Sequence, residues 1–209
     1  RALLPNHHLL VDIDDGFGDA TVASHVARTL ERSGASGVVL EDQARPRRCG
    51  HLDGKQLLPL PEYLNKLEAV LADRSSLVVV ARTDASDPKE IVTRVQAFEQ
   101  AGCDAVLADG LKDLELIAQI RAAVACPVFS NVIGGGKVPA CSRADLAGHG
   151  VQGLIYSTPC LFAAQGAIER ALEDLSDAAA DLSGALASPR QLSHCNALLQ
   201  ANLKRAGEA

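Results

Sequence analysis

The sequence predicts an α/β protein built on a parallel sheet, and three observations support this fold class. Short runs rich in Val, Leu and Ile recur along the chain, and amphipathic segments with apolar residues at helical spacing lie between them. Most successive runs start about 25 to 30 residues apart, which is the length of one strand–helix unit. Six such units favour a (β/α)₈ TIM-type barrel without its first two strands, or else an open doubly wound sheet.

Each predicted strand is an almost continuous apolar run, as is typical of parallel strands that are buried on both faces. The runs are also too short to be helices. No G-x-G-x-x-G motif follows any of them, which argues against a dinucleotide-binding sheet. The six predicted strands are Leu9–Ile13, Gly37–Leu40, Leu77–Ala81, Ala105–Ala108, Pro127–Ser130 and Gly153–Tyr156.

The predicted helices occupy the segments between the strands. One of them begins at Pro88, with Asp87 as the expected N-cap. Ile91, Val95 and Phe98 share one face of it, at the spacing that lets a helix pack on a sheet. The predicted helices are Ala20–Arg32, Glu62–Asp73, Pro88–Gln100, Leu111–Val124, Ser142–Leu146, Pro159–Leu175 and one near Pro189–Arg205.

We expect two parts along the chain. Residues 1–175 would form the barrel, as its third to eighth strands. After Leu175 the composition shifts to Ala, Ser, Asp and Gly, and no further strand is predicted. Residues 176–209 would therefore form a helical tail, and we expect this tail to pack on a partner subunit.

Composition and charge exclude several classes of protein. The 209 residues carry 20 basic and 26 acidic side chains, for a formal net charge of −6, and no basic run is longer than Arg47–Arg48. A nucleic-acid binder would show a stripe of Lys and Arg instead. With 47% hydrophobic and 22% charged residues the chain has the composition of a folded globular protein. Neither a membrane-spanning run nor a secretory signal is present, so we expect a cytoplasmic protein.

The cysteines predict one reactive candidate. Six cysteines include no C-x-x-C pair, and a disulfide framework is not expected in a chain of this kind. Cys49 differs from the others because it lies in the polar loop 45–55, after Arg47–Arg48 and before His51. Nearby cations stabilise a thiolate, so Cys49 is a candidate reactive or acid–base group, with an inert cysteine as the alternative. Two glycines would let this loop close over a ligand.

In parallel α/β folds the carboxyl ends of the strands face the active site, and here these ends are acidic. Asp12 and Asp14 close the first strand, and alternation would aim both at the barrel mouth. Paired carboxylates repel each other unless a cation relieves them, and Mg²⁺ with several retained waters is a fitting partner. The alternative is a cluster that caps and turns the chain, and Asp15 is expected to be structural. Glu41 ends the second strand.

Polar residues also end the remaining strands. Arg82 offers a planar fork suited to a substrate carboxylate, or else an internal salt bridge to the acids described above. Asp109 and Asn131 follow the fourth and fifth strands. Asn131 leads into a Gly-Gly-Gly-Lys137 run, which matches a phosphate loop poorly and favours a flexible polar loop.

Four motifs in this order resemble a known family. D-x-D-D-G-F-G at 12–18, E-D-Q at 41–43, R-R-C-G-H at 47–51 and A-R-T-D-A at 81–85 resemble the isocitrate lyase/phosphoenolpyruvate mutase superfamily. The resemblance covers roughly residues 9–165 and is closest to the 2-methylisocitrate lyase-like members. It implies a (β/α)₈ barrel, Mg²⁺ with Mn²⁺ as an alternative, and a homo-oligomer, either a tetramer or a dimer of dimers, whose subunits exchange the last helix.

The resemblance also implies roles for individual residues. For the metal site, Asp14 would lie nearest Mg²⁺, with Asp12 and Glu41 holding its waters. The substrate would contact Arg82, Gly50, Asn131 and Asp109, and the catalytic residues would be Cys49, Arg47 and His51.

Three positions depart from the family pattern and leave the exact substrate open. Arg47 stands where the lyases usually carry a lysine, and Arg holds its proton far more tightly, so proton transfer there is not expected. Asp109 takes the place of the usual glutamate after the fourth strand. Three glycines and Lys137 replace the typical residues after Asn131.

We therefore expect a Mg²⁺-dependent carbon–carbon lyase. It would cleave a small 2-hydroxy di- or tricarboxylate, similar to 2-methylisocitrate, to a 2-oxo acid and a second carboxylate. Metal and Arg82 would hold the substrate, and Cys49 would protonate the departing carbanion. The alternatives are an oxaloacetate-type decarboxylase or hydrolase, a carboxyphosphonoenolpyruvate mutase-like enzyme, and a non-catalytic metabolite-binding barrel.

Overall fold

The computed structural model describes residues 6–176 and 192–207. The chain forms two compact units. The first runs from Asn6 to Ser157 and contains a sheet with helices α1 to α5, and the second begins at Thr158 and contains helices α6 and α8. Because the two units are separate bodies, each is described by itself.

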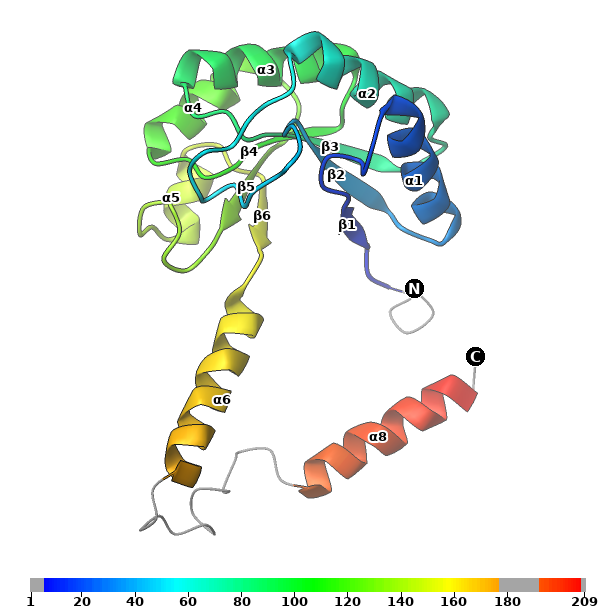
Figure 1. Ribbon diagram of the computed structural model, residues 1–209, viewed down its shortest axis with the longest axis vertical. Helices are drawn as coiled ribbons and strands as arrows, with labels where there is room; N and C mark the ends of the chain where they lie inside the picture. Colours follow the sequence, from blue (N-terminus) through cyan, green and yellow to red (C-terminus); the bar gives the residue numbers. More distant parts are fainter. Residues whose placement is uncertain (1–5, 177–191, 208–209) are drawn as a thin grey trace. The chain divides into compact units, whose positions relative to one another are not determined.

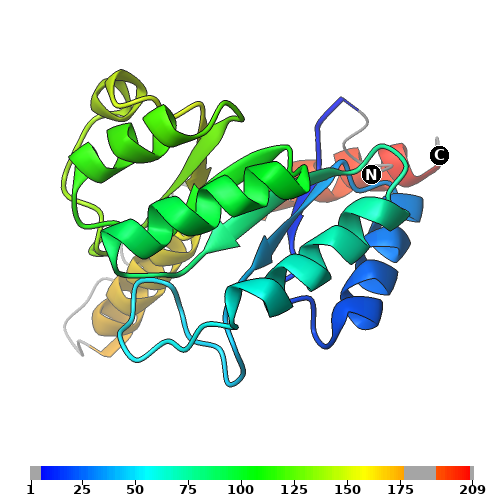
Figure 2. The ribbon, with the colours of Figure 1, turned by 90° about the horizontal axis from the view of Figure 1, so that it is seen from above.

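The sheet of the first unit has six parallel strands in the order β1-β2-β3-β4-β5-β6. They curve into an open half-barrel with the helices on the outer side (Figures 1 and 2). This confirms the α/β barrel prediction and excludes the doubly wound alternative, in which the strand order would reverse and helices would cover both faces. The strands are β1 Leu10–Asp12, β2 Gly37–Glu41, β3 Val78–Thr83, β4 Ala105–Ala108, β5 Val128–Val132 and β6 Gly153–Tyr156.

Side-chain caps determine where several helices begin. The Asp87 carboxylate accepts the Glu90 N–H at 2.9 Å, as predicted for the start of α3. Helix α4 begins later than predicted because the Asp113 carboxylate caps it, accepting the Glu115 N–H at 3.0 Å. The helices of the first unit are α1 Ala20–Arg32, α2 Leu60–Asp73, α3 Pro88–Ala101, α4 Leu114–Ala123 and α5 Arg143–Gly148.

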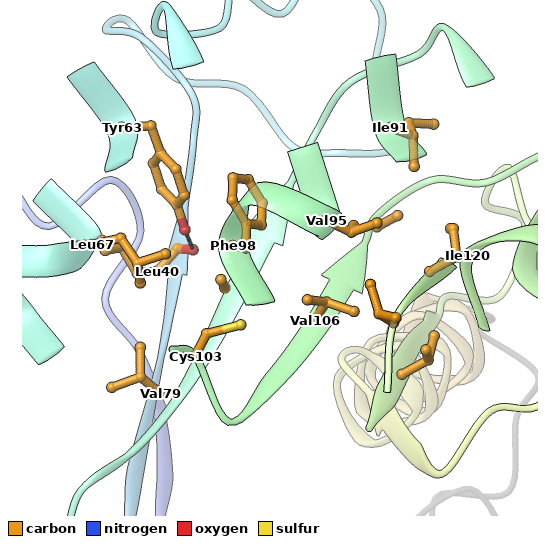
Figure 3. Packing of buried hydrophobic residues seen from close by; sticks show 14 of the residues in the cluster. Leu40, Tyr63, Leu67, Val79, Ile91, Val95, Phe98, Cys103, Val106 and Ile120 are labelled. Atoms are coloured by element: carbon orange, nitrogen blue, oxygen red, sulfur yellow. Dashed lines mark hydrogen bonds between the residues drawn. The ribbon is translucent and has the colours of Figure 1, made fainter. Parts of the chain in front are cut away.

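The main core lies between the sheet and the helices (Figure 3). Tyr63 of α2 and Phe98 of α3 pack with their ring centroids 4.7 Å apart, and the Tyr63 hydroxyl donates to Leu40 O at 2.8 Å. The buried phenol therefore has an acceptor, as a buried hydroxyl needs. Alternate strand residues face the concave side and form a smaller cluster: Val39, Val80, Ala105 and Leu107, with Phe129 and Ile155.

The second unit contains helix α6, Pro159–Ser176, and helix α8, Leu192–Gly207. Both were predicted as helices, although the predicted start of the last one lies outside the described residues. Large apolar side chains along α6 are exposed, including Leu161, Ile168 and Leu172. No helix among the described residues is long and apolar enough to cross a membrane.

Candidate active site

The parallel register places the predicted site residues at one end of the sheet. Glu41 of β2 pairs with Arg82 of β3, which in turn neighbours Leu107 of β4, two residues before Asp109. Asn131 lies on β5 at the same end. Because all six strands run in one direction, their polar carboxyl ends meet at one edge, as expected for this fold class.

Arg82 lies at the centre of the site and is buried. Its guanidinium forms a two-point contact with Asp84, with Nε at 3.0 Å from Oδ2 and Nη2 at 3.1 Å from Oδ1. Nη2 also lies 2.7 Å from Asp109 Oδ2 and 3.4 Å from Glu41 Oε2. This is the internal salt-bridge network that the sequence left as the alternative. Burial opposes the charge, but Asp84, Asp109 and Glu41 together raise the pKa of Arg82.

The turn after β1 differs from the prediction. Asp12 ends the strand, but Asp14 lies in the following turn at φ 52°, so the two carboxylates do not alternate along one strand face. Instead, Asp12 Oδ1 accepts the Asp14 N–H at 2.9 Å, which is the local turn contact of the alternative interpretation. The Asp14 carbonyl accepts the Glu41 N–H at 2.9 Å and ties the turn to β2.

Asp15 lies in the interior and is structural, as expected. Its carboxylate pairs with Arg45 at 2.6 and 2.9 Å and accepts the Phe17 N–H at 3.1 Å, while its carbonyl accepts from Lys66 Nζ at 2.6 Å. Burial acts to raise the pKa of Asp15, but the contacts with Arg45 and Phe17 outweigh it and lower that pKa. Asp15 therefore anchors the first residue of the cysteine-bearing loop, residues 45–55, to the turn after β1.

Arg47 connects two of the carboxylates assigned to the metal. Its Nε lies 2.7 Å from Glu41 Oε1, and its Nη2 lies 2.9 Å from Asp14 Oδ1. Burial of Glu41 raises the pKa of its carboxyl to about 7, against the opposing effects of Arg47 and Arg82. Arg47 is therefore directed at Glu41, at the end of β2, and at Asp14, in the turn after β1.

The carboxylates around Arg47 are the candidate ligands for Mg²⁺. In the described ranges, no group of three His, Cys, Asp or Glu side chains lies close enough together to hold a metal directly. Asp14 and Glu41 nevertheless share one cationic group, the Arg47 guanidinium, so their oxygens lie close enough to serve a common cation. Hard carboxylate oxygens with accessible space, such as the half-exposed Asp12, fit a Mg²⁺ ion that keeps several waters, provided that Arg47 withdraws.

The cysteine-bearing loop lies directly against the central arginine. Gly50 is buried, and a Cβ at this position would overlap Asp109 Oδ2 and lie only 2.7 Å from Arg82 Nη2. Lys55 Nζ donates to Gly50 O at 2.5 Å and lies 3.3 Å from Asp84 Oδ1. Lys55 thereby connects the loop backbone at Gly50 to the buried carboxylate of Asp84. Cys49 itself is exposed. Only glycine allows such a close approach of the backbone.

His51 and Asn131 both face Asp109. His51 Nε2 lies 3.3 Å from Asp109 Oδ1, and Asn131 Nδ2 donates to the same oxygen at 3.1 Å. Asn131 Oδ1 accepts from Ser157 Oγ at 2.5 Å, which fixes the orientation of the amide. The structure thus brings Arg82, Gly50, His51, Asn131 and Asp109 together around the Asp109 carboxylate.

Three residues of the site were missed by the sequence reasoning. Asp84 lies two residues after Arg82 in the A-R-T-D-A motif, so an ion pair between them could have been predicted from the sequence. Lys55 ends the cysteine-bearing loop, but no spacing indicated that its ammonium would reach Asp84. Lys137 belongs to the glycine run, and instead of a phosphate cradle it forms contacts to the cysteine-bearing loop.

Comparisons with known proteins identify the family. The profile of the family described as "Phosphoenolpyruvate phosphomutase" matches residues 4–176. The chain belongs to the phosphoenolpyruvate mutase/isocitrate lyase superfamily. Among curated members of the superfamily, 2-methylisocitrate lyase of Bacillus subtilis (strain 168) is 36% identical over 165 residues, which is 78% of this chain and 55% of the relative. The 2,3-dimethylmalate lyase of Eubacterium barkeri is 29% identical and covers 77% of this chain and 57% of the relative.

Solved structures of the superfamily agree with the fold. Oxaloacetate acetylhydrolase in complex with 3,3-difluorooxalacetate superposes with a TM-score of 0.88 at 29% identity, over 99% of this chain and 71% of that one. The trigonal form of 2,3-dimethylmalate lyase gives a TM-score of 0.86 at 27% identity, over 96% and 69%. The chain spans a little over half the length of its curated relatives. Superfamily members include lyases, hydrolases and mutases, and most are carbon–carbon lyases.

Proposed function

We propose that this chain carries the catalytic site of a Mg²⁺-dependent carbon–carbon lyase that cleaves a small 2-hydroxy di- or tricarboxylate of the 2-methylisocitrate class. The main support is the placement of the cysteine-bearing loop, whose Gly50 lies against Arg82 and Asp109. This arrangement puts Cys49 on the segment that covers the most charged part of the site. The likeness to 2-methylisocitrate lyases supports the same class.

Binding would begin with exchange of ion pairs. The Arg82 guanidinium is now ion-paired with four carboxylates, those of Asp12, Glu41, Asp84 and Asp109. A substrate carboxylate would take one of these positions, at Glu41 or Asp109. The buried His51 Nε2 and the Asn131 amide would contact the remaining oxygens. Mg²⁺, when bound by Asp14 with Asp12 and Glu41 around its waters, would polarise the hydroxyl and carboxylate oxygens as a Lewis acid.

The reaction would be a retro-aldol cleavage of the Claisen type. A base takes the hydroxyl proton, the O–H electron pair becomes the new C=O bond, and the adjacent C–C bond breaks. Its electron pair stays on the carbon next to the second carboxylate, and Cys49 Sγ–H donates a proton to that carbon. Closure of the loop would keep water away from the carbanion. The products are a 2-oxo acid and a second carboxylate.

A hydrolase or decarboxylase acting on an oxaloacetate-like acid is the second candidate. It is a candidate because an oxaloacetate acetylhydrolase matches this chain as well as a lyase does, with a TM-score of 0.88 against 0.86 for 2,3-dimethylmalate lyase. In both candidates Mg²⁺ and Arg82 would hold the acid. They differ in the fate of the carbanion, which the lyase protonates from the cysteine.

A substrate panel separates the two candidates. The purified chain with Mg²⁺ is incubated with 2-methylisocitrate, isocitrate, 2,3-dimethylmalate and oxaloacetate, and the products are identified by mass spectrometry. We expect pyruvate or glyoxylate together with a second carboxylate, and loss of both in Cys49→Ser. Release of oxalate and acetate from oxaloacetate would favour the hydrolase. Binding of every acid without turnover would support a metabolite-binding barrel, and light scattering tests the expected homotetramer.

A further inference from the structure

The glycine-rich segment after β5 contacts the cysteine-bearing loop at three points. The Lys137 N–H donates to His51 Nδ1 at 2.9 Å. Lys137 Nζ lies 2.7 Å from Asp53 Oδ1 and donates to Leu52 O at 3.3 Å. The partners lie 84 to 86 positions apart in the chain, so only the fold brings them together. None of these contacts has a place in the reaction described above.

The backbone contact determines which ring nitrogen of His51 carries the proton. Since Nδ1 accepts the Lys137 N–H, the neutral ring must carry its hydrogen on Nε2. The side chain is only 6% exposed, and Nε2 lies 3.3 Å from Asp109 Oδ1 but makes no hydrogen bond to it or to any other described residue. A buried N–H that makes no hydrogen bond destabilises the folded state. This N–H is therefore available to donate to an acceptor that enters the site, such as a carboxylate oxygen of a substrate.

Glycine at position 136 leaves the room that this contact needs. A Cβ on Gly136 would overlap His51 Nδ1 and lie 2.9 Å from Cε1 of the same ring. Gly134, two residues earlier, has open space where its Cβ would be, and its φ is unstrained. Alanine at position 136 would therefore collide with the His51 ring, whereas alanine at position 134 would not, so Gly134→Ala is the matched control for Gly136→Ala.

We propose that Lys137 is a positioning residue for the cysteine-bearing loop. Its N–H holds His51 in the Nε2–H tautomer, and its ammonium group holds the tip of the loop through Asp53. Together the two contacts keep Gly50 against Arg82, and with it the neighbouring cysteine. The inference rests on the proposed function in one respect only, since the substrate oxygen that His51 meets belongs to that function.

The ammonium contact is tested by limited trypsin cleavage of the full chain after Arg47 and Arg48, followed by mass spectrometry. Lys137→Ala and Asp53→Asn should each be cleaved about two- to fivefold faster there, because an exposed pair contributes modestly. The double variant should be cleaved no faster than Lys137→Ala alone, since that variant already removes the contact with Asp53 together with the one to Leu52 O. Unchanged cleavage rates in the single variants, or additive increases in the double variant, would show that the ammonium group of Lys137 does not hold the loop through Asp53. Asp53 is 90% exposed, so the variants are expected to fold.

The backbone contact is tested by the tautomer of the His51 ring, measured by long-range ¹H–¹⁵N correlation in ¹⁵N-histidine-labelled protein. Wild type and Gly134→Ala should show the Nε2–H form. Gly136→Ala should lose it and be cleaved about tenfold faster, because the added methyl displaces the ring. An Nδ1–H ring in wild type, or an unchanged ring in Gly136→Ala, would refute the role of Lys137.

Neither measurement needs a substrate. If the ring and the loop respond as expected while no acid of the panel is turned over, the proposed function fails and the role of Lys137 stands. If the acids are turned over but the ring and the loop do not respond, the proposed function stands and the role of Lys137 fails.

Discussion

Replacement of Gly50 by alanine should prevent the cysteine-bearing loop from closing. In the structure a Cβ at this position would overlap Asp109 Oδ2 and lie 2.5 Å from Asp84 Oδ1 and 2.7 Å from Arg82 Nη2. All three neighbours belong to a buried ion-pair network, so none of them can move aside without breaking a contact of 2.7 to 3.1 Å. The cysteine-bearing loop must therefore move instead, because its tip is held by an exposed ion pair, that of Lys137 and Asp53.

The size of the effect follows from the cost of overpacking. Inserting a methyl group into a well-packed site costs about 1–3 kcal/mol, and each 1.36 kcal/mol is a factor of ten in an equilibrium. The closed population of Gly50→Ala should therefore fall by about 5- to 150-fold relative to wild type. If chemistry occurs only in the closed state, kcat/KM falls by the same factor. The free energy of unfolding should change little, because an open loop relieves the clash.

The assay compares kcat/KM on the best substrate of the panel with the rate of tryptic cleavage inside the loop. Gly134→Ala is the matched control, since its Cβ would meet open space. Gly50→Ala should lose activity and gain cleavage, while the control should do neither. A Gly50→Ala enzyme with kcat/KM within twofold of wild type would show that this close approach has no part in the reaction.

Four further predictions concern single side chains. Cys49→Ser should be nearly inactive but still bind Mg²⁺, measured by calorimetry, and full turnover would exclude cysteine as the proton donor. Arg82→Lys should lower kcat/KM by roughly 10- to 100-fold, about 1.4 to 2.7 kcal/mol, and loss of stability with unchanged KM would instead support a purely structural arginine. Asp14→Ala should lose Mg²⁺ binding with the circular dichroism spectrum unchanged, whereas wild-type affinity would refute the metal assignment. Asp15 has a pKa below its ordinary 3.8, so its contribution to stability is present above that value and is lost as the pH falls further. Asp15→Asn should therefore flatten the acid limb of the unfolding free energy, and an unchanged limb in urea titrations would contradict this.

The strands and the site edge could be predicted because both depend on local patterns. Apolar runs indicated all six strands, and since parallel strands end at one edge, the residues after them could be placed together. The alternation argument failed at Asp14, because a left-handed turn begins there and strand periodicity no longer applies. The contact between Lys137 and His51 spans 86 positions, and no local pattern encodes such a pair. Arg47 was correctly placed in the loop, but which acid it pairs with depends on the folded loop.

The strand order has a consequence for how the chain folds. Each strand pairs only with the strand that precedes it and the strand that follows it in the sequence, so each pairing closes a loop of a single strand–helix unit. Each unit can therefore dock on the preceding one during synthesis, before the rest of the sheet exists. Truncation from the carboxyl end would then shorten the sheet one strand at a time. A break at β3 would instead separate β1–β2 from β4–β6, because within residues 6–176 and 192–207 no other strand bridges them.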